Sequence, residues 1–308
     1  MKMPAPIAAK LDRLASGAAA RPRVLDLFAG CGGLSLGFQA AGCEIVAATE
    51  LDELAALSHA TNFFKGCSQH EIDRHAKSHD ITEIDPEELI AYFGLGPPSR
   101  AIDIIVGGPP CQAYARVGRA KLREVAEHPQ AFKVDPRANL YLRYLRYVER
   151  LKPLALMMEN VPDILNHGGH NVIQEIVEAL ETMGYDARYS LINSAHHGIP
   201  QMRDRVFMIA FHRSLGAPIR FPGASHCCEL FQSYLGHAGS PRRSGTCTFQ
   251  FDEEPCKGAS ELTGNARARA SPGCFPSGHL GSLRKIAQPI LNQISRLVEP
   301  RGVEPLTS

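Results

Sequence analysis

Short apolar runs alternate with helical patterns through the first two thirds of the chain, and this alternation constrains the fold most. Each run is bounded by turn residues and is largely apolar on both faces, as is typical of strands buried in a parallel sheet. The sequence therefore predicts a doubly wound α/β sheet that binds its ligands beyond the carboxyl ends of the strands. The five expected strands are Val24–Phe28, Glu44–Ala48, Ile102–Val106, Leu154–Met158 and Val206–Phe211.

Helical patterns fill the segments between these runs. The clearest begins at Asp135, a typical N-cap residue, and places Leu140, Tyr144 and Val148 on one face. That face is expected to pack against the sheet.

Composition is that of a globular protein. The chain has 308 residues, of which 44% are hydrophobic and 21% charged, so extensive disorder is excluded. The formal net charge of +1 does not indicate any class of binding partner. No run approaches the about 18 apolar residues of a membrane span, and the first 21 residues do not have the pattern of a secretory signal. We therefore expect a cytoplasmic protein without membrane association, whose nine cysteines are reduced.

A glycine-rich turn follows the first expected strand, in the segment DLFAGCGG over residues 26–33. Gly30, Gly32 and Gly33 let the backbone approach a ligand without an intervening Cβ. Glu50 ends the next strand, twenty residues after Gly30, and an acid at that spacing is placed to bond ribose hydroxyls.

Asp26 argues against a dinucleotide in this turn, because its carboxylate would repel a pyrophosphate. The glycine pattern is also G-x-G-G rather than G-x-G-x-x-G. A carboxylate here suits a positively charged ligand, such as the amino group and sulfonium of S-adenosylmethionine. The alternative is a purely structural turn between strand and helix.

A cysteine follows the third expected strand in the segment GGPPCQ, residues 107–112. Pro109 and Pro110 fix the backbone and present Cys111 at the carboxyl end of the sheet. A thiol there can act as a nucleophile if its pKa is lowered or its substrate is activated. The alternative is a small buried hydrophobic side chain.

Two further segments place charged residues at strand ends. Glu159, in MMENVP, would have its pKa raised by apolar neighbours and could then carry a proton; the alternative is a cap for the next turn. Arg203 and Arg205, in QMRDR, point to one face and suit a phosphate or a base oxygen.

Together these segments resemble the motifs of the cytosine-C5 DNA methyltransferase family. The resemblance covers about residues 22–212 in the order of the family and implies a mostly parallel, Rossmann-like S-adenosylmethionine methyltransferase fold. DLFAGxGGxxxGF stands at Asp26–Phe38, PPCQ at Pro109–Gln112, ENV at Glu159–Val161 and QxRxR at Gln201–Arg205.

The resemblance implies a covalent mechanism on a cytosine flipped out of double-stranded DNA. The Cys111 thiolate would attack ring carbon 6, and Glu159 would hold ring nitrogen 3 and the exocyclic amine. Carbon 5 would then take the methyl group from S-adenosylmethionine. Arg205 would contact the flipped base and Arg203 the DNA backbone.

The resemblance also implies a cofactor site. Phe28 would pack on the adenine, Glu50 would bind the ribose and Leu140 would close the pocket, with Asp80 and Ile81 facing the adenine edge. The full expected set is Asp26, Phe28, Gly30, Gly32, Gly33, Glu50, Asp80, Ile81, Pro109 and Leu140.

Basic residues follow the expected nucleophile at Arg116, Arg119, Lys121 and Arg123. They would neutralise phosphates of the DNA and supply the local positive charge that the overall balance lacks. The alternative is a solvated charged loop.

Two departures from the family pattern concern the nucleophile loop and the C-terminal region. Ala115 stands where the family usually has serine, and the lost hydroxyl costs about 0.5–1.5 kcal/mol if it forms a hydrogen bond. The composition also changes near Gly223, and the later Arg-Pro-type and Gly-Asn-Ser motifs are not found. We therefore expect a catalytic and cofactor-binding domain over residues 1–222 and a divergent or truncated recognition region over 223–308, with one short helix at 289–298.

An insertion between the second and third expected strands holds Cys67, His70, His75 and His79. These types can bind a metal ion, but their spacing fits no compact zinc knuckle. We expect no metal site.

We therefore expect a monomeric DNA (cytosine-5-)-methyltransferase, the modification enzyme of a restriction system with a cognate restriction endonuclease. A tRNA cytosine-C5 methyltransferase has the same catalytic motifs and stays open, as does a truncated, non-catalytic remnant that binds cofactor or nucleic acid. A Rossmann dehydrogenase is disfavoured by Asp26 and the G-x-G-G turn.

Overall fold

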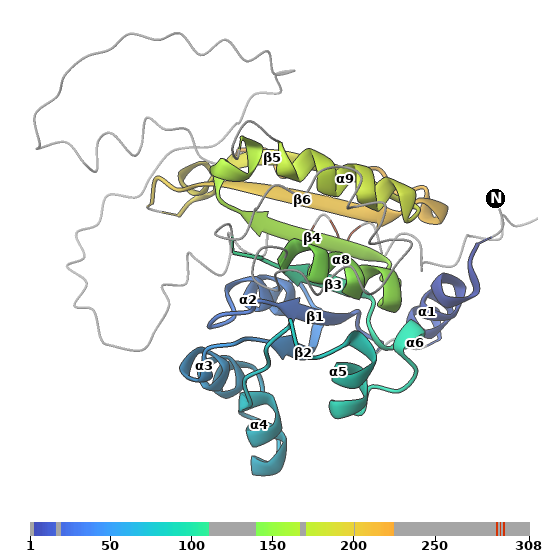
Figure 1. The fold of residues 1–308 in the computed structure, drawn as a ribbon, viewed down its shortest axis with the longest axis vertical. Coiled ribbons are helices and arrows are strands. Elements are labelled where there is room, and N and C mark those ends of the chain that lie inside the picture. Colours follow the sequence, from blue (N-terminus) through green and yellow to red (C-terminus); the bar gives the residue numbers. More distant parts are fainter. Residues whose placement is uncertain are drawn as a thin grey trace, which may run out of the picture.

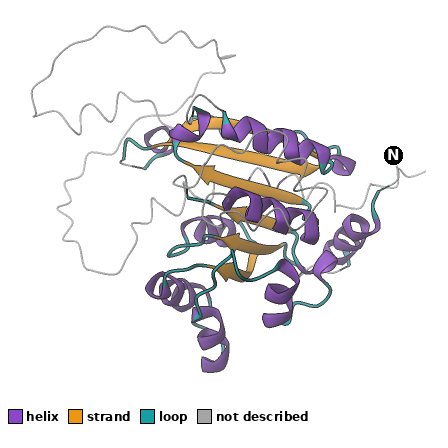
Figure 2. Ribbon diagram, in the orientation of Figure 1, coloured by secondary structure: helices purple, strands orange, loops and turns teal. Residues whose placement is uncertain are grey.

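A six-stranded sheet with helices on both faces forms the centre of the molecule (Figures 1 and 2). The computed structural model describes residues 3–16, 20–110, 140–166, 171–199 and 201–224, and also residues 288, 290 and 292. The strands are β1 (Arg23–Leu27), β2 (Glu44–Thr49), β3 (Ile104–Gly107), β4 (Ala155–Asn160), β5 (Tyr185–Asn193) and β6 (Asp204–His212).

Eight α-helices surround the sheet within the described residues. They are α1 (Ala5–Ala15), α2 (Gly33–Ala40), α3 (Glu53–Phe63), α4 (Gln69–Ala76), α5 (Pro86–Tyr92), α6 (Pro98–Ala101), α8 (Leu140–Leu151) and α9 (Val172–Thr182). Three short 3-10 turns complete the regular structure: η3 (Pro162–Leu165), η4 (Ser194–His197) and η5 (Arg213–Leu215).

The strand order β2-β1-β3-β4-β6-β5 confirms the predicted doubly wound sheet. The chain leaves β1 in one direction to reach β2 and later returns on the other side as β3, and β1, β2, β3 and β4 are all parallel. The order of the sheet therefore reverses beside β1, and the crevice at the carboxyl end of β1 and β3 is the expected ligand site.

The second half of the sheet corrects the prediction. The strand expected at Val206–Phe211 is present as β6, but it runs antiparallel to both β4 and β5 rather than parallel. Strand β5, Tyr185–Asn193, was not predicted at all. Its sequence YDARYSLIN alternates buried and exposed positions at first instead of forming an apolar run, because this strand lies at the edge of the sheet.

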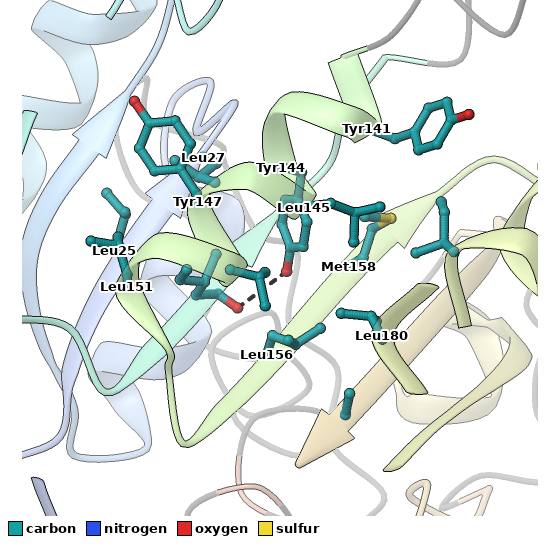
Figure 3. Close-up of a cluster of buried hydrophobic side chains, with 14 of the residues drawn as sticks. Leu25, Leu27, Tyr141, Tyr144, Leu145, Tyr147, Leu151, Leu156, Met158 and Leu180 are labelled. Carbon is teal, nitrogen blue, oxygen red and sulfur yellow. Dashed lines mark hydrogen bonds between the residues drawn. The ribbon is translucent and has the colours of Figure 1, made fainter. Parts of the chain in front are cut away.

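Alternation along the strands divides the core into two layers. Leu25 of β1, Leu156 of β4 and Met208 of β6 pack against α5, α8 and α9 on one face. Figure 3 shows part of this layer, where side chains of α8 such as Tyr144 meet those of the sheet. On the other face, Val24 of β1 and Met157 of β4 pack with α1 and α2.

A buried lysine connects helix α1 to the C-terminal end of α8. Lys10 is fully buried, and its Nζ donates hydrogen bonds to the carbonyl oxygens of Leu151 (2.8 Å) and Lys152 (2.7 Å). Burial lowers the pKa of Lys10 to about 7. Arg13, one turn later, forms an ion pair with the buried Asp103.

The C-terminal part of the chain enters the description at three positions only. Gln288, Ile290 and Asn292 are helical, and two of them fall in the helix predicted at 289–298. Ile290 is fully buried in the same core layer as Ile7 and Leu14 of α1. The remainder of the predicted recognition region beyond residue 224 lies outside the described residues.

The histidines of the insertion pack against aromatic rings. His75 lies between Phe64 and Phe93, with ring centroids 3.5 and 4.7 Å away, and His79 meets Tyr92 edge-on at 4.9 Å. Within the described part of the chain, no three His, Cys, Asp or Glu side chains gather as metal ligands would. None of the described helices combines the length and apolar character that crossing a membrane requires.

Candidate active site

Two cavities open at the carboxyl ends of the parallel strands. The larger, of about 350 Å³, is lined by residues of β1, β4 and β6 and by the turns beside them. The smaller, of about 280 Å³, is lined by the segments that follow β2 and β3 and by the start of α8. Phe28 and Gly108 line both cavities, so the two meet at these residues.

The larger cavity gathers the charged residues predicted from three separate motifs. Asp26, Glu159, Arg203 and Arg205 all line it. Asp26 alternates with Leu25 on β1, and Glu159 alternates with Met158 on β4, so both carboxylates project from the face that is covered by α2. Because parallel strands end at the same edge of the sheet, alternation brings these distant residues together.

Glu159 and Arg205 form the central ion pair of this cavity. Arg205 Nε donates to Glu159 Oε1 at 2.9 Å, across the antiparallel pairing of β4 and β6. Burial raises the pKa of Glu159, while Arg205 and Arg203 act in the opposite direction. The carboxyl group is therefore held in place by a cation, while its burial favours the protonated form.

Gly108 lets the segment before Cys111 approach this carboxylate. A Cβ on Gly108 would lie 3.2 Å from Glu159 Oε2, which is tighter than an ordinary van der Waals contact. Asn160 connects the same two segments, because its Nδ2 donates to the carbonyl oxygen of Pro109 at 2.9 Å. Asn160 is thus a positioning residue. The sequence analysis included it in the Glu159–Val161 motif but predicted no role for it.

Pro109, predicted to contact the cofactor, lines neither of the two cavities. It is buried, and its neighbour Pro110, rather than Pro109 itself, lines the smaller cavity. Cys111 and Ala115 follow directly and lie outside the described residues, as do the basic residues Arg116, Arg119, Lys121 and Arg123.

Asp26 is almost completely buried, with 1% of its surface exposed. Its Oδ2 accepts hydrogen bonds from the amide (3.1 Å) and the hydroxyl (2.6 Å) of Ser35. Its Oδ1 has no hydrogen-bond partner among the described residues. Burial raises the pKa of Asp26 to about 7, because the charged form is poorly solvated there.

The glycine turn holds two different contacts. The amide of Gly30 donates to Glu50 Oε2 at 2.8 Å, while Glu50 Oε1 accepts from the amides of Leu51 and Asp52. Gly32 has a φ of 95° and precedes α2, where an added Cβ would lie 2.2 Å from the ring of Phe63. Gly32 therefore allows α3 to pack against the turn, and of the three predicted glycines only Gly33 lines a cavity.

Phe28 has an unusual backbone conformation for a bulky residue, with a φ of 60°. The strand β1 ends one residue earlier, so the chain turns sharply here and places Phe28 between the two cavities. Such strain is common at ligand sites, where the surrounding structure holds it.

The smaller cavity brings together the residues predicted to surround an adenosine. Phe28, Glu50, Asp80, Ile81 and Leu140 all line it, although they come from four separate segments. Thr82, two residues later, orients the carboxylate of Asp80. The Oδ1 atom of Asp80 accepts hydrogen bonds from the amide (2.8 Å) and the hydroxyl (2.7 Å) of Thr82.

An arginine that sequence reasoning missed holds the wall of the smaller cavity. Arg143 of α8 is largely buried, and it donates to the carbonyl oxygens of Ile81 (2.7 Å) and Ile84 (2.8 Å). Tyr147 also donates to the carbonyl oxygen of Ile84 at 3.0 Å. No local pattern could have revealed these contacts, since the partners are about sixty residues apart.

His197 was also missed. It ends η4, is 5% exposed and lines the larger cavity together with Ser194. A single 3-10 turn has too short a period to be recognised in the sequence. The only available signal was its position four residues before the Gln201–Arg205 motif.

Comparison with known proteins decides the family. The family model for the C-5 cytosine-specific DNA methylase matches residues 22–232. The chain belongs to this family. The six-stranded sheet is accordingly the Rossmann-like fold of S-adenosylmethionine-dependent C5 methyltransferases, a family that generally depends on this cofactor.

Individual relatives are similar over the same part of the chain. A protein of Oceanobacillus iheyensis named as type II methyltransferase M.OihORF3336P is 40% identical over 206 residues, which are 67% of this chain and 43% of the relative. The type II methyltransferase M.XorII of Xanthomonas oryzae is 34% identical over 64% of this chain and 42% of its own length. The chain spans about half the length of the curated relatives that it matches.

One solved structure is also similar to part of this chain. A crystal structure described as a prophage-encoded DNA modification methyltransferase of E. coli is 29% identical, with a TM-score of 0.49. The match covers 65% of this chain and 49% of that chain.

Proposed function

We propose that this C-5 cytosine-specific DNA methylase family member is a DNA (cytosine-5-)-methyltransferase that uses S-adenosylmethionine and a covalent cysteine intermediate. The observation that carries the proposal is the larger cavity, where the Glu159–Arg205 pair lies with Asp26 and with Gly108 of the segment leading to Cys111. Cytosine is a poor electrophile, so its methylation at carbon 5 requires both a nucleophile and an acid.

In this proposal Glu159 binds the amidine edge of a flipped cytosine and delivers a proton to ring nitrogen 3. The Cys111 thiolate forms a bond to carbon 6, and the electron pair of the ring makes carbon 5 nucleophilic. Carbon 5 would take the methyl group as the bond from methyl to the sulfonium sulfur breaks, which leaves S-adenosylhomocysteine. A base then removes the carbon 5 proton, the bond to Cys111 breaks, and the proton on ring nitrogen 3 returns to Glu159. Arg205 holds Glu159 in place and contacts the base, while the exposed Arg203 contacts the DNA backbone.

The cofactor fits the residues of both cavities. S-adenosylmethionine supplies an electrophilic methyl group. Phe28, Glu50, Asp80, Ile81 and Leu140 would hold its adenosine in the smaller cavity. Asp26, whose Oδ1 is buried and has no partner among the described residues, would accept a hydrogen bond from its amino group. Gly33 lies at the wall of the larger cavity, while Gly30, Gly32 and Pro109 shape the backbone around it.

We further propose that residues 1–222 form the catalytic and cofactor-binding domain and residues 223–308 a divergent recognition region. Relatives that bear the name type II methyltransferase support a role as the modification enzyme of a restriction system, acting as a cytoplasmic monomer beside a cognate endonuclease. Limited proteolysis tests the boundary, since cleavage near residue 223 should release a resistant fragment. Equal resistance over the whole chain would contradict it.

The reaction itself can be tested with DNA that carries 5-fluorocytosine. The fluorine cannot leave as a proton does, so an active chain remains covalently attached and runs as a gel-stable adduct in the presence of S-adenosylmethionine. The adduct should disappear in Cys111→Ser, while an exposed control such as Ser58→Ala should keep it. An adduct with tRNA but none with DNA would contradict the DNA substrate, and no adduct with either would contradict the catalytic proposal.

A further inference from the structure

A chain of polar groups contacts the carboxylate of Asp26, and its members Ser35 and His59 do not line the larger cavity. Ser35 of α2 donates both its amide and its hydroxyl to Asp26 Oδ2, at 3.1 and 2.6 Å. His59 of α3 lies behind the serine, with Nε2 3.0 Å from Ser35 Oγ. All three side chains are at most 1% exposed, so water cannot replace these contacts.

The direction of these hydrogen bonds follows from proton count. A serine hydroxyl has one proton, and a charged Asp26 takes it at 2.6 Å. The hydroxyl must then accept from His59, which requires that His59 carry its proton on Nε2. Burial lowers the pKa of His59 to about 4, so the ring is neutral and has one proton to give. The donors therefore run in one direction, from His59 through Ser35 to Asp26.

The two oxygens of Asp26 consequently have different roles. Oδ2 accepts two hydrogen bonds and lies near the N-terminus of α2, where a negative charge is favoured. Oδ1 is buried without a partner among the described residues, and Asp26 lines the larger cavity. A proton or a cationic donor can therefore satisfy Oδ1, but not Oδ2.

We propose that Ser35, supported by His59, is a positioning residue that holds Asp26 as a charged acceptor for the ammonium group of S-adenosylmethionine. This inference rests on the proposed function, and it adds the residues that set the charge of the cofactor site. An ammonium group donates N–H hydrogen bonds and is positively charged, so it suits a buried, charged carboxylate oxygen better than the neutral donors of the cofactor do.

Other groups around Asp26 make this support necessary. The carboxylate of Glu50, after β2, raises the pKa of Asp26 and so disfavours its negative charge. Tyr144 of α8 lies close enough to interact with Asp26 from the opposite face of the sheet. Strand β3 contributes only Ile104, Ile105, Val106 and Gly107 beside it. Glu159, Arg203 and Arg205 share the larger cavity, where Glu159 forms an ion pair with Arg205. Ser35 is thus the hydrogen-bond donor that the described structure provides to this carboxylate.

The decisive experiment measures the affinity of the full chain for S-adenosylhomocysteine by calorimetry between pH 6 and 8.5. This probe keeps the ammonium group, and methylthioadenosine, which lacks it, serves as the second ligand. Wild-type affinity should fall below about pH 7, where Asp26 gains a proton. Ser35→Ala should move this midpoint up by about one pH unit, because it removes a hydrogen bond to a charged group.

The expected effect depends on pH in a way that a purely structural role would not. At pH 7 the Kd of Ser35→Ala should be about fivefold higher than that of wild type, and at pH 8.5 the two should agree within about 1.5-fold. His59→Phe keeps the ring packing and should shift the midpoint in the same direction by less. Ser58→Ala removes an exposed hydroxyl that bonds only to the carbonyl of Leu54, and it should behave as wild type.

Three results would overturn the inference: equal loss of affinity at every pH, an equal effect on methylthioadenosine, or no difference between Ser35→Ala and wild type. Failure of wild type to bind S-adenosylhomocysteine would also overturn it. The 5-fluorocytosine adduct reports the proposed function separately. If the protein forms the adduct but its affinity does not depend on pH, the proposed function stands and this inference fails. If the affinity depends on pH as expected but no adduct forms, this inference stands and the proposed function fails.

Discussion

Replacement of Arg143 by methionine should lower the affinity of the smaller cavity for its ligand, although Arg143 does not itself line that cavity. Arg143 donates to the carbonyl oxygens of Ile81 and Ile84, and its Nη1 lies 3.5 Å from Asp85. Methionine fills much of the same volume but donates nothing. Ile84 keeps the hydrogen bond from Tyr147, so the carbonyl of Ile81 is the group that loses its support.

The magnitude follows from these contacts. A hydrogen bond from a charged donor contributes about 1.5–3 kcal/mol, and part of that is returned because the buried guanidinium no longer has to be desolvated. We expect the free energy of unfolding to fall by about 2 kcal/mol. We expect the Kd for S-adenosylhomocysteine to rise about tenfold, which corresponds to 1.4 kcal/mol, because Asp80 and Ile81 are no longer held at the cavity.

The assay combines thermal unfolding with calorimetric titration of S-adenosylhomocysteine. Arg150→Met is the matched control, since Arg150 lies on the same helix and forms an exposed ion pair with Glu87. Loss of such a pair should change stability by less than about 1 kcal/mol and leave the Kd unchanged. Arg143→Lys should recover part of the affinity. If Arg143→Met binds the probe as tightly as Arg150→Met, Arg143 does not position the cavity wall.

Three further predictions concern single positions. Glu159→Gln removes the proton that the acid delivers, so methylation should fall by about 10²-fold or more while the protein stays folded, as judged by circular dichroism; unchanged turnover would show that Glu159 is not the acid. Gly32→Ala introduces a Cβ at φ 95° against Phe63, and denaturant unfolding should detect a loss of about 2 kcal/mol; a neutral result would mean that α3 can move aside. Lys10 has a folded pKa of about 7, below its unfolded value of 10.5, so the unfolded state binds the extra proton between these values and the stability due to Lys10 should rise with pH across that window. Lys10→Met should flatten this part of the profile, and an equal slope in both proteins would refute the assignment.

The strands of the sheet could be predicted where a short stretch of sequence is sufficient to identify them. Buried parallel strands have continuous apolar runs, and four of the five expected strands form the parallel half of the sheet. Strand β5 lies at the edge and carries Asp186, Arg188 and Ser190 between its buried positions, so it did not match the pattern that was sought. Because β5 was not recognised, the antiparallel direction of β6, its neighbour in the sheet, was not predicted either.

The candidate site could be predicted where a motif specifies a residue type, but not where contacts depend on packing. The residues Glu159 and Arg205 were identified from separate motifs, and the structure joins them by an ion pair. The supporting contacts of Ser35, His59 and Arg143 depend on helices that meet only in the folded chain. The sequence likewise did not reveal that His75 stacks between two phenylalanines, because its partners Phe64 and Phe93 are distant along the chain.

The alternation that places Asp26, Glu159 and Arg205 on one side of the sheet limits how a gene for this chain can change. Loss or gain of one codon within β1, β4 or the start of β6 would turn the following charged side chain to the opposite layer, into the apolar contacts of α5, α8 and α9. Helix α4 carries no such parity requirement, because it is no part of the sheet and has no buried residue. Length variation during evolution is therefore expected around α4, and strict conservation of length within the three strands.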